Sequence, residues 1–63
     1  MEDYKQRVID EGTELKDKME KLGKFILTEA FDELDQDDQD LLKLQLKAMI
    51  NYLNILTERI NRF

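Results

Sequence analysis

Apolar residues recur every three or four positions along most of this chain, and that spacing is the period of an amphipathic helix. Over about residues 3–27 they form two neighbouring heptad rows, Val8-Leu15-Leu22 and Gly12-Met19-Ile26. The opposite face is nearly all charged and carries three acid-first pairs at i,i+4 spacing: Glu14/Lys18, Asp17/Lys21 and Glu20/Lys24. The pattern predicts a first helix over about residues 3–27 that buries one face and exposes a solvated one.

The register breaks in residues 28–35, where the side chains are typical of helix ends. Thr28 can cap a short helical turn that carries Phe31, and Asp35 can cap the helix that follows. The acids that come next lie in a first helical turn, where they complement the helix dipole. A calcium loop is the alternative, but the stretch lacks the glycine at the sharp turn and the final glutamate of such a loop. Helix capping is therefore the favoured interpretation.

A second helix is predicted over about residues 36–62, where apolar residues form a complete seam in steps of four and three. The seam consists of Leu42, Leu46, Met49, Leu53, Leu56, Ile60 and Phe63. A second row runs beside it with the same steps and consists of Leu41, Gln45, Ala48, Tyr52, Ile55 and Arg59. One partner helix covers one seam, so the second row requires a further partner.

These elements predict an all-α fold, in which residues 1–63 form a single antiparallel helical hairpin. The second row would leave an apolar strip larger than monomers usually tolerate. We therefore expect the hairpin to assemble with itself into a helix bundle, as a homodimer or a homotetramer. The expected interface residues are Leu41, Gln45, Ala48, Tyr52 and Ile55.

Composition supports assembly, because a chain of 63 residues buries only about 60% of its unfolded surface. It has no Cys or His, so neither disulfides nor zinc are expected to stabilise it, and no metal site or cofactor is predicted. No apolar run reaches the roughly 18 to 20 residues that span a bilayer. The expected location is the cytoplasm, with no membrane contact.

The formal net charge of −5 conceals an uneven distribution of charge. Residues 29–40 hold seven acids and no base, so the remaining eight acids face all ten Lys and Arg residues, a balance of +2. In the hairpin, the start of the first helix lies beside the end of the second and about 35 to 40 Å from the acidic turn. Acidic and basic groups are thus separated along the molecule.

The end of the hairpin away from the turn is the candidate binding site, which we call the pole. It gathers Tyr4, Lys5, Arg7, Asn54, Arg59, Asn61, Arg62 and Phe63. Arg side chains suit phosphate oxygens and aromatic faces suit bases, so Tyr4, Lys5, Arg7, Tyr52, Arg59 and Arg62 are the candidate ligand-binding residues. The structural alternative is that cations in a last helical turn complement its dipole and that Phe63 only completes the seam. Catalysis is not predicted, because the chain lacks Ser, Cys and His.

The chain also resembles a group of short phage proteins first catalogued from crAss-like phages. The resemblance rests on Phe31, Leu34, Leu41 and Leu42 around the turn, followed by Gln45, Leu46, Ala48, Met49, Tyr52, Ile55, Leu56, Arg59 and Ile60. Gly12 and Gly23 are departures from this pattern. Small oligomeric helical phage proteins include sponges that sequester the cyclic nucleotides with which bacteria signal infection. By this analogy the expected function is anti-defence in an infected bacterial host, directed against CBASS or Thoeris-type signalling.

Two other functions are compatible with the same sequence. The hairpin is similar in length and turn to a small plasmid copy-number regulator, a four-helix bundle that binds paired RNA loops. RNA binding requires a basic stripe, whereas the outer face of the first helix is of mixed sign, so RNA is disfavoured. DNA is not expected as a partner of a chain with a net charge of −5. The third possibility is an adaptor whose apolar strip binds another protein.

Overall fold

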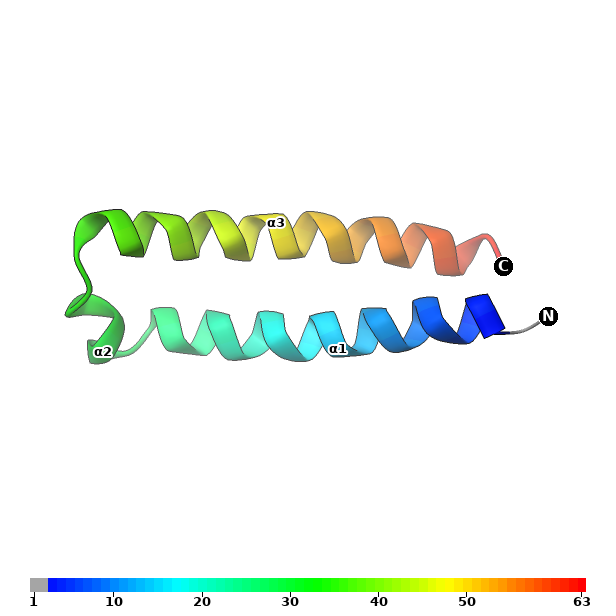
Figure 1. Cartoon of the computed structure of the whole chain (residues 1–63), viewed down its shortest axis with the longest axis horizontal. Coiled ribbons are helices and arrows are strands. Elements are labelled where there is room, and N and C mark those ends of the chain that lie inside the picture. The colour runs from blue at the N-terminus through cyan, green and yellow to red at the C-terminus, as the bar shows by residue number, and fades with distance from the viewer. Residues whose placement is uncertain (1–2) are drawn as a thin grey trace.

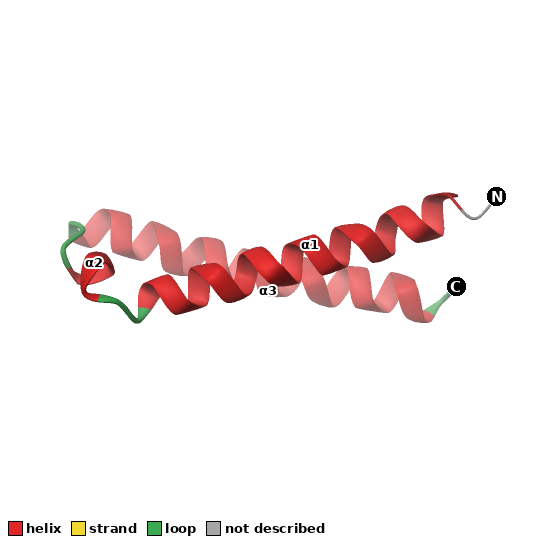
Figure 2. Cartoon of the chain, turned by 90° about the horizontal axis from the view of Figure 1, so that it is seen from below, coloured by secondary structure: helices red, strands yellow, loops and turns green. Residues whose placement is uncertain are grey.

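The computed structural model describes residues 3–63 and contains the helices α1 (Asp3–Ile26), α2 (Glu29–Asp32) and α3 (Gln36–Asn61). The two long helices lie side by side and antiparallel, and α2 closes one end of the hairpin (Figure 1). Seen at right angles to this view, α1 and α3 cross at a shallow angle, as helices in bundles do (Figure 2). The molecule measures 48 × 14 × 13 Å. The predicted all-α hairpin is confirmed.

Local hydrogen bonds explain where the chain turns. The Thr28 hydroxyl accepts a hydrogen bond from the Phe31 N–H at 3.3 Å, and an Asp35 carboxylate oxygen accepts one from the Asp38 N–H at 2.9 Å. Each residue satisfies a backbone donor that the start of a helix would otherwise leave unpaired. The side-chain amide of Gln39 also donates to the Leu34 carbonyl at 2.9 Å. Both predicted caps are therefore present, and α3 is tied back to the turn.

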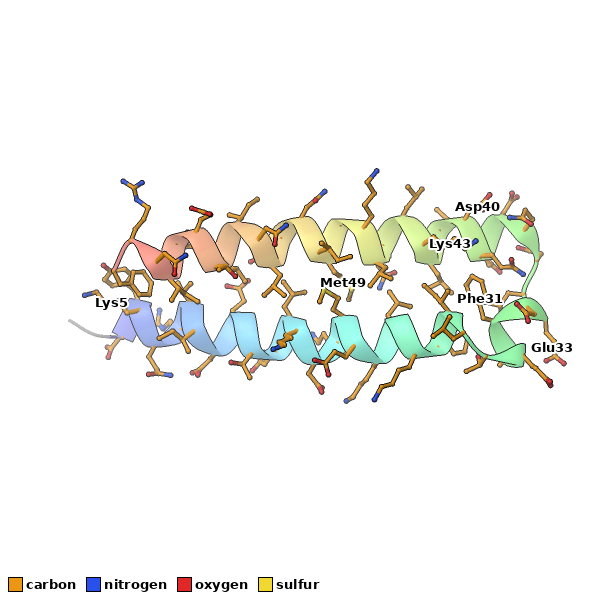
Figure 3. The ribbon with its side chains drawn as sticks, turned by 180° about the vertical axis from the view of Figure 1, so that it is seen from behind. Lys5, Phe31, Glu33, Asp40, Lys43 and Met49 are labelled. Carbon is orange, nitrogen blue, oxygen red and sulfur yellow. The ribbon has the colours of Figure 1, made fainter. Side chains whose placement is uncertain are left out.

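The hydrophobic core is a thin line between the two long helices. Its buried apolar side chains are Val8, Phe31 and Leu56, and Leu56 is 0% exposed. Phe31 enters from α2 and packs edge-on against Phe25, with ring centroids 6.1 Å apart, while Met49 points from α3 toward α1 (Figure 3). So small a core contributes only a few kcal/mol of net stability in a chain of this length.

The second apolar row of α3 faces away from the core. Leu41 is 62% exposed and Ile55 is 57% exposed, and the neighbouring Leu44, which is not in the row, is 61% exposed. Gln45 and Ala48 are exposed beside them. The hairpin therefore covers only one of the two rows, and self-association through the other remains a prediction.

Of the three charge pairs predicted on the outer face of α1, one forms among the described residues. The Lys21 ammonium lies 3.0 Å from an Asp17 carboxylate oxygen, and both side chains are exposed. Exposed ion pairs contribute about 0 to 1 kcal/mol, so their formation has little influence on the fold. Within residues 3–63, no helix is both long enough and apolar enough to cross a membrane.

The two glycines of α1 provide a test of this packing. A Cβ placed on Gly12 would lie 3.9 Å from Ile60 Cδ1, an ordinary contact, and one on Gly23 would meet nothing within 4 Å. Since neither glycine has positive φ, Gly12→Ala and Gly23→Ala should each raise the free energy of unfolding by about 1 kcal/mol. Urea unfolding measures the effect, and Lys16→Gly, at an exposed position of α1 away from the α3 face, is the control that should lower the free energy of unfolding. A loss of stability in Gly12→Ala would reveal a closer approach at this position than the hairpin itself makes.

Candidate functional site

The two helix ends meet in an aromatic cluster at the pole. The rings of Tyr4 and Phe63 pack edge to face, with centroids 5.8 Å apart and an interplanar angle of 77°. The Lys5 ammonium lies 5.8 Å from the Phe63 ring centroid, within the range of a cation–π interaction. Lys5 lies at the end of the molecule opposite Phe31 and the turn (Figure 3). The fold thus brings Tyr4, Lys5 and Phe63 together from opposite ends of the chain.

The three arginines at this end extend into solvent. Arg7 lies in the second turn of α1, Arg59 lies in the last turn of α3, and Arg62 is the C-cap residue of α3. All three are exposed, and none lies within 4 Å of a carboxylate oxygen among the described residues. Their guanidinium N–H groups are therefore available to an anion, because the hairpin's own described carboxylates do not occupy them.

The pole is not a broad basic surface. Its cations Lys5, Arg7, Arg59 and Arg62 share this end of the hairpin with several acids, which among the described residues are Asp3, Asp10, Glu11 and Glu58. Long-range attraction for an anion is correspondingly weak, because neighbouring charges of opposite sign cancel at a distance. Recognition of an anion here depends instead on short, directed N–H contacts.

Tyr52 has a structural role that the sequence pattern did not reveal. Its hydroxyl group donates a hydrogen bond to a carboxylate oxygen of Glu11, which joins α3 to α1 along one flank of the hairpin. Tyr52 as a residue remains 41% exposed, and Glu11 is half-buried. The phenol therefore bonds within the hairpin, while part of the ring stays open on the second row of α3.

Removing the Tyr52 hydroxyl group should weaken the hairpin without removing the ring. We expect Tyr52→Phe to lower the free energy of unfolding by about 1 kcal/mol, because a hydrogen bond between the helices is lost. A double-mutant cycle with Glu11→Gln measures the coupling between the two side chains. Additive effects of the two substitutions would contradict a direct contact.

The remaining predicted residues occupy different surfaces. Asn54 and Asn61 are exposed on α3, whereas the predicted interface residues Leu41, Gln45, Ala48 and Ile55 lie on the second row. In the described part of the chain, no three His, Cys, Asp or Glu residues are grouped so that they could hold a metal ion. Residues 3–63 of a single hairpin enclose no pocket.

The chain folds as a small helical hairpin with exposed cations at one end and an uncovered apolar row along α3. A family model described as Sequestin matches residues 2–62, so the chain belongs to the Sequestin family. Searches of curated proteins and of solved structures gave no match to the chain. The family name denotes sequestration, in agreement with the predicted sequestering function rather than a catalytic one.

Proposed function

We propose that this protein is a phage anti-defence sponge, which sequesters a cyclic di- or oligonucleotide immune signal between subunits and does not cleave it. It would act in the cytoplasm of an infected bacterial cell, against CBASS or Thoeris-type signalling. The observation that carries the proposal is the match of nearly the whole chain to a family named for sequestration. The aromatic and cationic groups gathered at the pole provide the chemistry that such a ligand needs.

The cations of the pole bind the phosphates in this proposal. Arg7, Arg59 and Arg62 present exposed guanidinium groups, whose N–H donors can each contact two phosphate oxygens. Lys5 adds a compact positive charge next to the Phe63 ring. Because the surrounding acids cancel the distant field, these direct contacts supply most of the affinity for the phosphates.

The tyrosines bind the bases. Tyr4 is 54% exposed and is held from one side by its edge-to-face contact with Phe63. A base stacked on an aromatic side chain contributes about 1 to 3 kcal/mol, whatever its identity. Tyr52 provides a second aromatic surface on the row of α3 that a neighbouring subunit would cover, so it would contact a base only at the border between two subunits.

Isothermal titration calorimetry tests the proposal directly, with cyclic dinucleotides, cyclic trinucleotides and ADP-ribose-type signals as separate ligands. The expected result is saturable binding of at least one ligand, which is recovered chemically unchanged after the protein is denatured. Absence of heat with every ligand would contradict the proposal. Binding of paired RNA loops that weakens steeply with salt would instead favour an RNA regulator.

A further inference from the structure

The uncovered face of α3 carries a strip of exposed residues whose spacing reads the same in both directions. We define the α3 strip as Asp37, Leu41, Leu44, Ala48, Tyr52, Ile55 and Arg59. The strip shares five residues with the second row, has Leu44 in place of Gln45, and adds Asp37. Consecutive members are separated by 4, 3, 4, 4, 3 and 4 residues, so the strip is symmetric about Ala48. At 3.6 residues per turn, all seven residues lie within an arc of about 80° around the helix axis, on one face of α3. We infer that a second copy of the chain packs on this strip, with the two α3 helices antiparallel and crossing at Ala48.

The symmetry places complementary residues opposite one another in such a pair. Leu41 meets the partner's Ile55, Leu44 meets the partner's Tyr52, and the small Ala48 allows the helices to approach closely at the two-fold axis. At each end of the strip, Asp37 lies opposite the partner's Arg59. A parallel pair would instead place like charges together at both ends, which is unfavourable.

The hairpin exposes more surface than a compact monomer of its mass, by about the area that one partner chain would cover. The chain exposes 5123 Å², whereas a compact monomer of 7.6 kDa is expected to expose about 4300 Å². The excess of roughly 800 Å² is similar to the area that each partner buries in an interface of standard size. Three apolar residues of the α3 strip, Leu41, Leu44 and Ile55, are each more than half exposed.

The pairing also completes the proposed ligand site, and this step rests on the proposed function. An arginine offers two edges of N–H donors, so the partner's Asp37 can bind one edge of Arg59 and leave the other for a phosphate. The carboxylate would hold an otherwise mobile guanidinium in place. The two poles of an antiparallel pair lie at opposite ends, so each pair has two sites, one for each chain.

Disulfide trapping tests the orientation, because the chain contains no cysteine of its own. The exposed residues are changed in separate proteins, Leu41→Cys and Ile55→Cys, which are then mixed and oxidised. An antiparallel pair predicts a mixed disulfide between the two variants and little disulfide in either variant alone. Leu27→Cys is the control, because this position is 86% exposed and lies off the strip. It should form a disulfide with neither of the two strip variants. Disulfides that join two copies of the same variant would show a parallel pair and overturn the inference.

Charge reversal tests the end contacts by sedimentation equilibrium, without any ligand. Asp37→Arg and Arg59→Asp should each weaken dimerisation by about 10-fold, and the double variant should return to within about 3-fold of the parent. Glu20→Arg on the outer face of α1 is the matched control and should change nothing. A monomer at all concentrations, or no rescue in the double variant, would overturn the inference. Failure of nucleotide binding alone would leave these results intact and would contradict only the proposed function.

Discussion

Replacing Leu56 with alanine should leave most of the protein unfolded. Leu56 is 0% exposed and lies in the α3 seam that packs against α1. Removal of a buried leucine side chain destabilises proteins by about 2 to 5 kcal/mol, through lost burial and through the cavity that remains. The core of a domain of this size supplies only about 3 to 5 kcal/mol of stability. The expected loss is therefore comparable with all of the stability that the core provides.

Far-ultraviolet circular dichroism measures the expected loss of helix in Leu56→Ala. Leu27→Ala is the matched control, because the same atoms are removed from a side chain that is 86% exposed. That control should change the free energy of unfolding by less than about 0.5 kcal/mol. If Leu56→Ala kept its helix content and unfolding midpoint, the single thin core described for the hairpin would be wrong.

Removing three cations from the pole should abolish measurable nucleotide binding. In the triple variant Lys5→Ala, Arg7→Ala, Arg59→Ala, each substitution deletes a charged donor worth about 1.5 to 3 kcal/mol when it bonds to an anion. Together they should weaken binding by on the order of 1000-fold or more. The helices should remain, because all three side chains lie at the open end and none belongs to the buried core.

A charge-matched variant separates directed contacts from general electrostatics. The triple variant Lys16→Ala, Lys24→Ala, Lys47→Ala removes the same net charge from exposed positions away from the pole. Calorimetry should show an affinity for this variant within a few-fold of the parent. Equal losses in both triple variants would mean that the anion is attracted by overall charge and is not bound by the pole.

The helices and their ends could be predicted from the sequence, because the signals that define them are local. Thr28 and Asp35 cap the helices that immediately follow them, and the seam of α3 repeats without interruption from Leu42 to Ile60. The antiparallel hairpin then requires Tyr4 and Phe63 to meet, and they do. These features depend only on the spacing of residues along the chain and on the need to bury the apolar seam of α3 against α1.

Other features depend on details that spacing does not fix. The hydrogen bond between Tyr52 and Glu11 requires a particular rotation of α1 about its axis, which brings Glu11 to the flank where Tyr52 lies. Glu14/Lys18 and Glu20/Lys24 share the spacing of Asp17/Lys21, but among the described residues only the last pair closes. Exposed pairs gain too little energy to hold one geometry. In the proposed function the ligand lies between subunits, so its identity would depend on how two chains combine, which spacing along one chain does not fix.

The most direct measurement is native mass spectrometry of the protein purified from cells that make cyclic-nucleotide signals. It reports the number of subunits and any retained small molecule in the same spectrum. The expected result is a dimer, or a multiple of it, that carries one uncleaved nucleotide for each chain. An oligomer with no added mass, or one that carries a cleaved nucleotide, would contradict sequestration.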